Sequence, residues 1–513
     1  MCRAILSNWN MLSTADRFGI LPPSNRRTQP MPPPPATLDR LDLPLCVDLD
    51  GTLIKTDLVW ESLVRLLKRN PLYLLVIPFW WIRGRAVLKR QLATRVKLDP
   101  ATLPYNASFL AFLRQASHQG RRLVLVTASD ALLAQAVAGY LGLFDEVLAS
   151  DGKLNLRGRA KSEVLTARFG PRGFDYAGNS TVDIPVWESA AAAVVVDSSP
   201  GLEEQAGQHA RLGATFPREV SRLSAFVRAL RPHHWVKNLI IFVPLLTSHQ
   251  LSNLTLLARA GWAFAAFCLC ASAVYMLNDL LDLDSDRQHP AKKARPFASG
   301  ELPLAAGLVA VPLLLAAAVA FAATLSWSFV SMLACYFLLT TAYSWFLRQI
   351  ALLDVFTLAG LYTVRLGAGG VATGVEISFW LWVFSMFIFL SLALVKRFVE
   401  LLALSQQKEP NLRGRGYLGR DLELVASLGS SCGFLAVLVL ALYVNSQDVL
   451  ILYHRPKLLL LGCPILLFWI SRVWLIAHRA RMADDPIVFA LRDWVSHLLG
   501  LLMLLVLWLA GRP

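Results

Sequence analysis

The chain has 513 residues, of which 55% are hydrophobic and 17% are charged. A soluble globular protein has about 45–50% apolar and about 25% charged residues, so this composition favours a membrane protein. It excludes a wholly disordered chain, a fibrous repeat and a purely cytosolic enzyme. The net charge of +15 would suit a nucleic-acid-binding protein, but cytoplasmic loops of membrane proteins also collect Lys and Arg, so we expect no nucleic acid partner. The seven cysteines show no paired spacing, which argues against a disulfide framework or a zinc site.

The N-terminal part of the chain combines a tail with an α/β domain. Residues 1–40 contain four consecutive prolines and little periodicity, which predicts a disordered tail. In residues 41–212, short apolar runs alternate with helical stretches, and this alternation predicts a parallel sheet with helices on both faces. The expected strands are LCVDLD (45–50), RRLVLVTAS (121–129), EVLAS (146–150) and AAAVVVDSS (191–199).

One segment of this domain, PLYLLVIPFWWI (71–82), is strongly apolar. At about 12 residues it is shorter than the ~20 residues that a spanning helix needs. Two interpretations are open at this point. The segment lies in the membrane interface with Trp80 and Trp81 at headgroup depth, or it is a buried helix of a cap.

From about residue 236 the chain becomes much more apolar, and nine segments are long enough, or nearly so, to span a membrane. They cover about 236–248, 255–277, 302–324, 326–346, 350–370, 378–395, 423–444, 457–477 and 494–511. We therefore expect residues 230–513 to form an all-α, polytopic membrane domain of about nine transmembrane helices. Residues 213–229 are expected to be a linker.

The loops between these segments predict the orientation. Basic residues concentrate in the loops after the second, sixth and eighth segments, where they are Arg287, Lys292, Lys293, Arg295, Lys396, Arg397, Lys408, Arg413, Arg415, Arg420, Arg472, Arg479, Arg481 and Arg492. Cytoplasmic loops carry an excess of Lys and Arg. We expect a multi-pass protein of the inner (cytoplasmic) membrane, with these loops and the N-terminal domain on the cytoplasmic side.

An acidic cluster, NDLLDLDSD (278–286), follows the second segment. Asp279, Asp282 and Asp286 lie at i, i+3 and i+7, which places three carboxylates on one helical face. Like charges at this spacing repel each other, so the cluster favours a bound cation, and hard oxygen ligands suit Mg²⁺. Lys292 and Arg295 follow closely and are candidates for holding the phosphates of a metal-bound substrate. The alternative is an acidic helix end in water with no ligand.

The cluster resembles the first aspartate-rich motif, NDxxDxxxD, of UbiA-type intramembrane prenyltransferases. Residues 343–370 resemble the second motif of that family, with Tyr343, Arg348, Asp354 and Arg365 at its positions. The resemblance implies a helical membrane fold in which these residues bind and orient a metal–diphosphate. Leu358 stands where the family more often has a carboxylate, and the KRFVE stretch (Lys396, Arg397, Glu400) is a possible replacement.

Two stretches narrow the branch of the family. RPHHWVKNLIIFVPLL (231–246) and DRQHPAKKARPFASG (286–300) resemble decaprenyl-phosphate phosphoribosyltransferases. The resemblance implies transfer of phosphoribosyl from phosphoribosyl diphosphate to a polyprenyl phosphate, with Lys237, Asn278, Lys292 and Arg295 as substrate ligands. The alternatives are a prenyl diphosphate-dependent aromatic prenyltransferase and, from another class, a transporter or non-catalytic membrane scaffold.

The N-terminal domain carries a second set of motifs. Asp48 and Asp50, in DLDGT after an apolar run, resemble the first motif of haloacid dehalogenase-type phosphotransferases, in which one carboxylate attacks phosphorus and the other acts as acid/base. This resemblance implies a Rossmann-like α/β fold, a helical cap at about 57–118 and a Mg²⁺ site. Further motif residues are Thr127 and Lys161 for phosphate, and Asn179 and Asp183 for the metal. Asn179 replaces an expected carboxylate, so a working phosphatase and a degenerate docking module both remain open.

Overall fold

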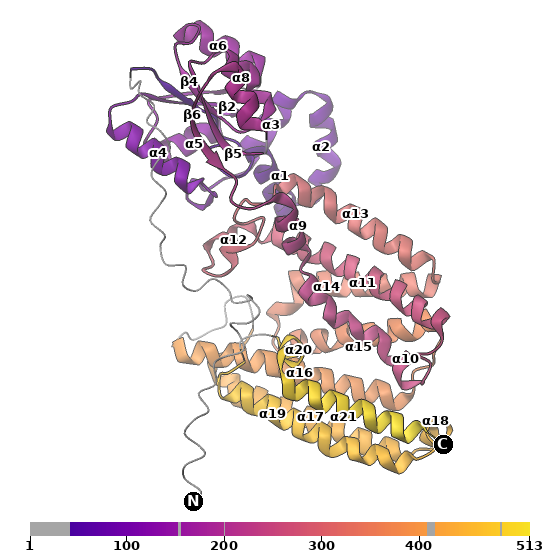
Figure 1. Ribbon diagram of the computed structural model, residues 1–513. Helices are drawn as coiled ribbons and strands as arrows, with labels where there is room; N and C mark the ends of the chain where they lie inside the picture. The colour runs from indigo at the N-terminus through magenta and orange to yellow at the C-terminus, as the bar shows by residue number, and fades with distance from the viewer. Residues whose placement is uncertain (1–41, 152–154, 200, 408–415, 483–484, 513) are drawn as a thin grey trace, which may run out of the picture.

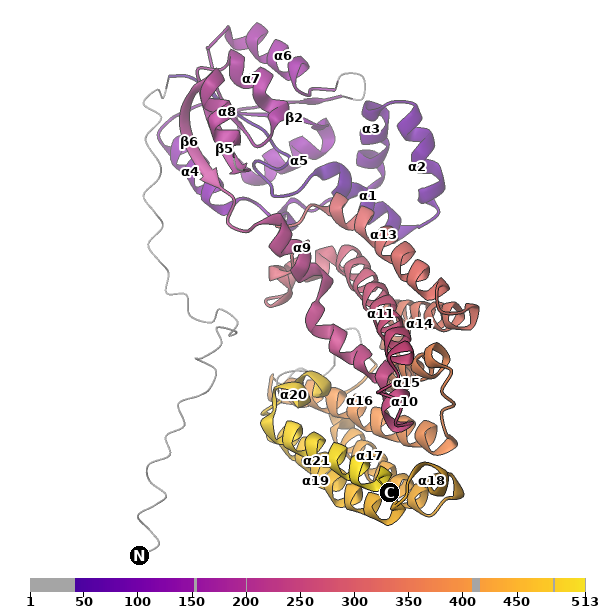
Figure 2. The same ribbon diagram turned by 45° about the vertical axis from the view of Figure 1, so that its right-hand side comes forward.

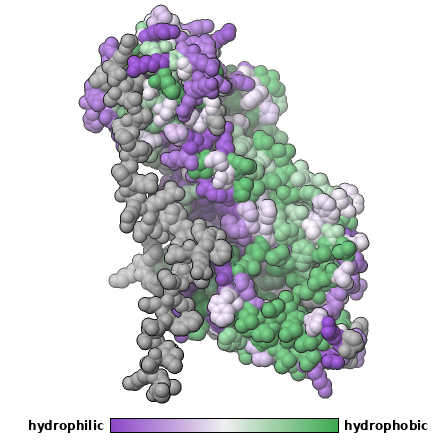
Figure 3. All heavy atoms as spheres, viewed as in Figure 1, coloured by the Kyte–Doolittle hydropathy of each residue, from purple (hydrophilic) through white to green (hydrophobic). Residues whose placement is uncertain are grey.

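The computed structural model describes residues 42–151, 155–199, 201–407, 416–482 and 485–512. The expected tail, 1–40, lies outside these residues. Figure 1 shows an α/β domain at one end of the molecule and a body of long helices at the other. The surface follows this division, because the α/β domain is mainly hydrophilic and the long helices are mainly apolar (Figure 3).

The α/β domain is built on a parallel sheet. Its strands are β1 (Leu45–Val47), β2 (Leu123–Asp130), β3 (Glu146–Ser150), β4 (Asp175–Gly178), β5 (Ala192–Ser198) and β6 (Arg211–Pro217). They lie in the order β3-β2-β1-β4-β5-β6, with Leu45 of the central strand paired with Leu123 and Asp175. The fold class predicted for this domain is confirmed. The sequence patterns identified four of these strands but not β4 or β6.

Helices cover both faces of the sheet. They are α4 (Ala107–His118), α5 (Ala131–Leu141), α6 (Arg159–Phe169), α7 (Ile184–Ser189) and α8 (Leu202–His209). Residues of α4 and α5 form one apolar core with the sheet, and residues of α6, α7 and α8 form the other. The strands are therefore buried on both sides, which explains their nearly continuous apolar sequences.

A small helical cap is inserted between β1 and α4. It contains α1 (Leu58–Arg69), α2 (Tyr73–Ile82) and α3 (Arg85–Arg95), which share a core of their own around Leu66, Trp80, Leu88 and Leu92. The expected cap range, about 57–118, is too long at its C-terminal end. Helix α4 lies within that range but packs on the sheet through Phe109 and Leu113.

Eight helices in the described part of the chain are long and apolar enough to cross a membrane. They are α11 (Leu254–Leu281), α13 (Leu304–Ala323), α14 (Trp327–Trp345), α15 (Leu353–Thr373), α16 (Phe379–Gln407), α17 (Leu422–Val444), α19 (Gly462–His478) and α21 (Trp494–Gly511). The shorter helices of this half are α9 (Arg222–Leu230), α10 (Val243–Thr247), α12 (Leu283–Gln288), α18 (Gln447–Leu452) and α20 (Pro486–Arg492).

The first of the nine expected spans, 236–248, is not one continuous α-helix. It forms the 3₁₀ helix η4 (Pro232–Phe242) followed by α10. The segment still runs from one end of the bundle to the other, because Arg231 pairs with Asp279 while His249 packs on Tyr453. The 11 residues of η4 rise about 2.0 Å each, and the 5 residues of α10 rise about 1.5 Å each. Together they reach about 30 Å, which is the thickness of a bilayer core.

The expected linker, 213–229, is structured in the described chain. Strand β6 carries the sheet past residue 212, and α9 packs Ala225 and Ala229 into an apolar core shared with α11 and α13. The start of the segment therefore belongs to the α/β domain, and its end packs on the membrane half.

The two halves meet along the cap helix α1 (Figure 2). Val64 of α1 lies in the same apolar core as Leu283 and Leu304 of the membrane half. Beside this core, Glu61 pairs with Arg287 at 2.6 Å and Arg65 pairs with Asp284 at 2.5 Å. The loop that carries the aspartate cluster is thus held directly by the α/β domain.

Candidate functional site

The three aspartates of the membrane half gather where α11 ends and α12 begins. Asp279 and Asp286 are buried, and Asp282 is half-buried at the junction. Arg295 joins two of them, since its Nη1 lies 3.1 Å from Asp279 and 2.6 Å from Asp286. Arg231, which ends α9, also pairs with Asp279. The carboxylates of Asp279 and Asp286 are therefore paired with the guanidinium groups of Arg231 and Arg295.

The turn after α14 closes the other side of this cluster. Arg348 lies 3.7 Å from Asp282, and the Asn278 amide donates to Ser344 at 2.9 Å. Tyr343 is half-buried beside Ser344 on α14, and Lys292 is exposed on the 3₁₀ turn after α12. The structure thus brings Arg348 and Asn278 close to the cluster, as their positions in the sequence motifs predict.

The donor set suits Mg²⁺. Carboxylate oxygens are its preferred ligands, and one oxygen of Asp279 is buried without a hydrogen-bond partner among the described residues. In that part of the chain no three potential ligands converge on one point. A bound Mg²⁺ would take its remaining ligands from water and substrate oxygens, as Mg²⁺ commonly does. It would neutralise a departing diphosphate, and the arginines would contact the same oxygens.

A second cationic group lies at the same end of the bundle. The Lys237 ammonium is 2.6 Å from Asp485, and the Lys396 ammonium is 3.5 Å from the same carboxylate. Burial alone would raise the pKa of Asp485, but the two lysines lower it to about 2. Near the aspartate cluster, the ring of Tyr275, one turn before Asp279, packs on His234 and lies under Arg231. Asp485 and Arg231 were not identified from the sequence.

Two residues of the second sequence motif make contacts other than those expected. Asp354 is fully buried, 2.5 Å from Arg397, and accepts a hydrogen bond from the Tyr417 hydroxyl at 2.6 Å. Arg365 is buried in the bundle, where it donates to Asn238 at 2.8 Å and to the Tyr336 hydroxyl at 2.9 Å. Both were expected in the diphosphate site. Their contacts tie helices of the bundle together, because a buried charge needs a partner.

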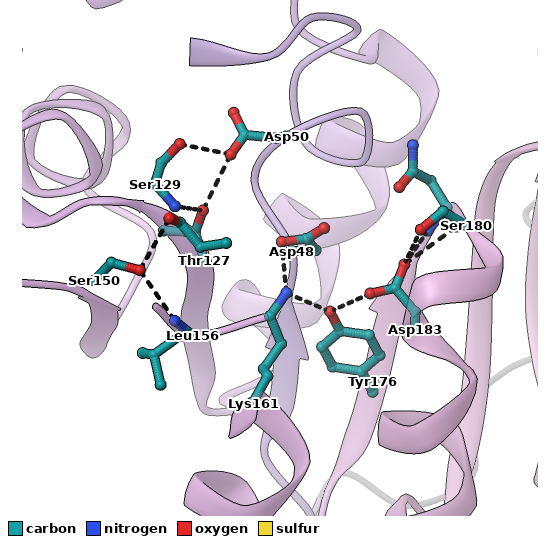
Figure 4. Close-up of polar contacts among 12 residues, drawn as sticks. Asp48, Asp50, Thr127, Ser129, Ser150, Leu156, Lys161, Tyr176, Ser180 and Asp183 are labelled. Atoms are coloured by element: carbon teal, nitrogen blue, oxygen red, sulfur yellow. Dashed lines mark hydrogen bonds and ion pairs between the residues drawn. The ribbon is translucent and has the colours of Figure 1, made fainter. Parts of the chain in front are cut away.

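The site of the α/β domain lies where β1 and its neighbours end (Figure 4). Asp48 and Asp50 follow β1, and Thr127 comes from β2. The Lys161 ammonium, on α6, donates to Asp48 at 2.8 Å and to the Tyr176 hydroxyl at 2.8 Å. Because the carboxyl ends of parallel strands meet at one edge of a sheet, residues far apart in sequence form one site.

Asp50 is held by three groups. The backbone N–H of Leu58 donates to one oxygen at 2.9 Å, and the hydroxyls of Ser129 and Thr127 donate to the other at 2.7 and 3.3 Å. Ser129 was missed, although it lies two residues after Thr127 in the motif. This arrangement fixes the Asp50 carboxyl group beside Asp48.

Both carboxyl groups of this site have a pKa above the ordinary value of an aspartate. Burial raises the pKa of Asp48 to about 7, although Lys161 acts against this. Burial also raises the pKa of Asp50 to about 6, with the Asp57 charge adding to it. A divalent cation would supply the missing positive charge, so these residues fit Mg²⁺.

The last motif forms the turn after β4. Asp183 accepts hydrogen bonds from the Ser180 N–H, the Ser180 hydroxyl and the Asn179 N–H at 3.1 Å each, and from the Tyr176 hydroxyl at 3.0 Å. These contacts anchor the turn and present Asn179 to the site. The Asn179 amide lies directly against Gly51, where an added Cβ would come within 2.1 Å of its nitrogen.

A cavity of about 400 Å³ opens in front of these residues. Its floor carries Asp48, Asp50, Lys161 and Asn179, and its other side is formed by Trp81 and neighbouring residues of the cap. It is large enough for a phosphorylated sugar. The cap therefore forms one wall of the space in front of Asp48 and Asp50.

Comparisons with known proteins agree with both halves. Residues 239–497 match the UbiA prenyltransferase family, and residues 45–188 match haloacid dehalogenase-like hydrolases. The chain is 38% identical, over 90% of each chain, to the uncharacterized protein y4nM of Sinorhizobium fredii. It is 37% identical to the nodulation protein NoeC of Azorhizobium caulinodans, over 53% of this chain and 88% of that one.

A third relative is the decaprenyl-phosphate phosphoribosyltransferase of Corynebacterium glutamicum. It is 33% identical over 34% of this chain and 54% of its own length. Together with the eight helices of the described residues that are long and apolar enough to cross a membrane, the matches make this a multi-pass membrane enzyme with a hydrolase-like domain. The chain belongs to the UbiA prenyltransferase family.

Proposed function

We propose that the membrane half transfers a phosphoribosyl group from phosphoribosyl diphosphate to a polyprenyl phosphate. The observation that carries the proposal is that two separate clusters of charged side chains lie at the same end of the bundle. The aspartate cluster with Arg231, Arg295 and Arg348 suits a metal-bound diphosphate. Lys237 and Lys396 suit a second, singly phosphorylated group. The similarity to a decaprenyl-phosphate phosphoribosyltransferase supports the same reaction.

The transfer forms a bond between an acceptor phosphate oxygen and the anomeric carbon of ribose, while the bond from that carbon to diphosphate breaks. Arg295 and Arg231 bind diphosphate oxygens as negative charge develops on them. Lys237 and Lys396 turn from Asp485 to the acceptor phosphate and hold its oxygen against the ribose. Positioning of this kind lowers the barrier of a reaction between two bound substrates.

The α/β domain then removes the 5-phosphate from the lipid-linked product. In this proposal the Asp48 carboxylate attacks phosphorus, and Asp50 protonates the departing sugar oxygen. Water then hydrolyses the aspartyl phosphate, with Asp50 accepting its proton. Because both sites belong to one chain, the product reaches the second site at high local concentration.

We also place both sites on the cytoplasmic side of the inner membrane. The basic loops support this orientation, since Lys292, Lys293 and Arg295 follow the aspartate cluster directly. A water-soluble phosphoribosyl diphosphate from the cytoplasm reaches sites in this orientation without crossing the bilayer.

The test offers the purified protein two substrate pairs in the presence of Mg²⁺. One tube receives labelled phosphoribosyl diphosphate and a polyprenyl phosphate, and the other receives a labelled prenyl diphosphate and 4-hydroxybenzoate. We expect label to enter the lipid phase in the first tube, and none to enter an aromatic product in the second. Product in the second tube alone identifies an aromatic prenyltransferase. Absence of product in both tubes contradicts the proposal and favours a transporter or scaffold.

A further inference from the structure

Helix α2 of the cap exposes an almost entirely apolar surface. Its ten residues, YLLVIPFWWI, include no charged side chain, and only Trp80 is buried. Leu75 is 70% exposed and Ile82 is 80% exposed. Other exposed apolar residues of the segment are Leu72, Leu74, Val76, Phe79 and Trp81. A helix that is apolar all round is normally surrounded by protein core or lipid.

This surface lies next to the membrane-spanning helices. Helix α1, which packs against α2 within the cap, also shares an apolar core with α11 and α13. Figures 1 and 2 both place α2 on the edge of the α/β domain above α13, whereas the sheet lies towards the opposite edge. Figure 3 shows apolar surface on this edge, close to the broad apolar surface of the spanning helices. Val309 and Leu313 of α13 are 60% and 63% exposed.

Basic side chains stand at both ends of α2. Lys68 and Arg69 precede it, and Arg83 and Arg85 follow it, and all four are exposed. A helix that lies in a membrane interface combines an apolar surface with Lys and Arg that reach anionic headgroups. The charges flanking α2 therefore complement a lipid surface and disfavour an apolar protein partner.

We propose that α2 lies in the headgroup region of the bilayer that surrounds α13, and that it opens the hydrolase cavity towards lipid. Trp81 is half exposed on α2 and also lines that cavity, with Arg85 stacked over its ring at 5.7 Å. A phosphate group on a membrane lipid enters the cavity past Trp81 while its chains remain in the bilayer. The substrate class is a lipid-linked phosphomonoester, and this last step rests on the proposed phosphatase function.

Lipid contact is tested by fluorescence quenching with the full chain in nanodiscs that contain anionic phospholipid. Cys2, Cys335, Cys432 and Cys463 are replaced by alanine, and a bimane label is attached at Leu75→Cys. We expect quenching by spin-labelled lipid and little quenching by aqueous iodide. Leu313→Cys on α13 is the lipid-exposed control, and Gln115→Cys on α4 is the water-exposed control.

Quenching of the Leu75→Cys label by iodide alone overturns the proposal. A label shielded from both quenchers also overturns it, because α2 is then covered by protein. Neither result depends on whether the hydrolase domain is active.

The substrate class is tested with the double variant Leu72→Ser/Leu75→Ser and a matched variant, Leu132→Ser/Leu212→Ser. The matched leucines are 45% and 41% exposed on the α/β domain and do not line the cavity. We expect the α2 variant to lose roughly tenfold in kcat/KM on the phosphoribosylated lipid and to keep its rate on p-nitrophenyl phosphate. Equal losses on both substrates, or in both variants, contradict lipid delivery by α2. If the parent chain hydrolyses neither substrate, the phosphatase function fails and with it the substrate class.

Discussion

Glu61 of the cap and Arg287 of the membrane half form a buried ion pair at 2.6 Å, and both side chains are almost completely shielded from water. Arg287 follows Asp286 of the aspartate cluster in the chain. Glu61 lies in the first turn of α1, and the N–H of Leu58, the first residue of that helix, donates to Asp50. Helix α1 thus contacts both Asp50 in the candidate site of the α/β domain and the loop that carries the aspartate cluster of the membrane half. The two halves are built as one unit rather than as domains on a flexible linker.

Breaking this pair is expected to destabilise the whole protein. Glu61→Gln leaves the Arg287 charge without its carboxylate, at a cost of about 3–5 kcal/mol. The thermal midpoint in detergent measures this loss, and Glu61→Gln/Arg287→Met should recover much of it. Arg122→Gln, in the half-exposed pair with Glu146, is the matched control and should cost about 0–1 kcal/mol. A Glu61→Gln variant as stable as this control contradicts the role of the pair.

The pH dependence of the same pair has a defined direction. Burial alone would raise the pKa of Glu61, but Arg287 and Arg65 lower it below its ordinary value. A carboxyl group with a lowered folded-state pKa contributes stability above its unfolded-state pKa and loses it as pH falls through the folded-state value. The difference in thermal midpoint between wild type and Glu61→Gln should therefore stay constant from pH about 8 to about 6. A difference that shrinks across this range shows that Glu61 is protonated near neutral pH.

The aspartate cluster should be essential for transfer. Asp279→Asn or Asp282→Asn removes negative charge that a Mg²⁺–diphosphate requires, so we expect transfer to fall by at least about a hundredfold. Omission of Mg²⁺ should have the same effect on the wild type. Leu313→Ser, on the lipid-facing surface of α13, is the control for membrane insertion. Near-normal turnover in either aspartate variant contradicts the assignment.

The two activities should be separable by single substitutions. Asp48→Asn removes the attacking carboxylate, so hydrolysis of a phosphomonoester should be lost while lipid transfer is retained. Loss of transfer in Asp48→Asn, with normal thermal stability, would show that the two sites act together.

Asn179 is expected to weaken metal binding in the hydrolase site. Asn179→Asp restores a carboxylate of the same shape against Gly51, and it should lower the Mg²⁺ concentration needed for half-maximal hydrolysis by about tenfold. Asn179→Ala should raise that concentration. If the wild type hydrolyses nothing and Asn179→Asp restores hydrolysis, the natural domain is a docking module that lost its activity at this position.

Much of both sites was predictable from local patterns. Asp48 and Thr127 follow apolar runs that became strands, as expected. Asp279, Asp282 and Asp286 were expected on one helical face, but the helix breaks at Asp282, so Asp279 ends α11 while Asp286 lies on α12. Such features depend on residues close in the chain and on the rule that parallel strands end at one edge of the sheet. The fold classes and the membrane character depend on composition and periodicity in the same way.

The tertiary structure decided the partners of the buried charges. Arg231 meets Asp279 across 48 positions and Lys237 meets Asp485 across 248, while Asp354 is bound by Arg397. It also decided that residues 232–242 cross the bundle as a 3₁₀ helix and that α2 keeps its apolar surface exposed. Hydropathy reports how apolar a segment is, but neither its backbone hydrogen bonds nor what surrounds it. The backbone conformation of a segment and its surroundings depend on how side chains that are distant in the sequence pack and pair once water is excluded.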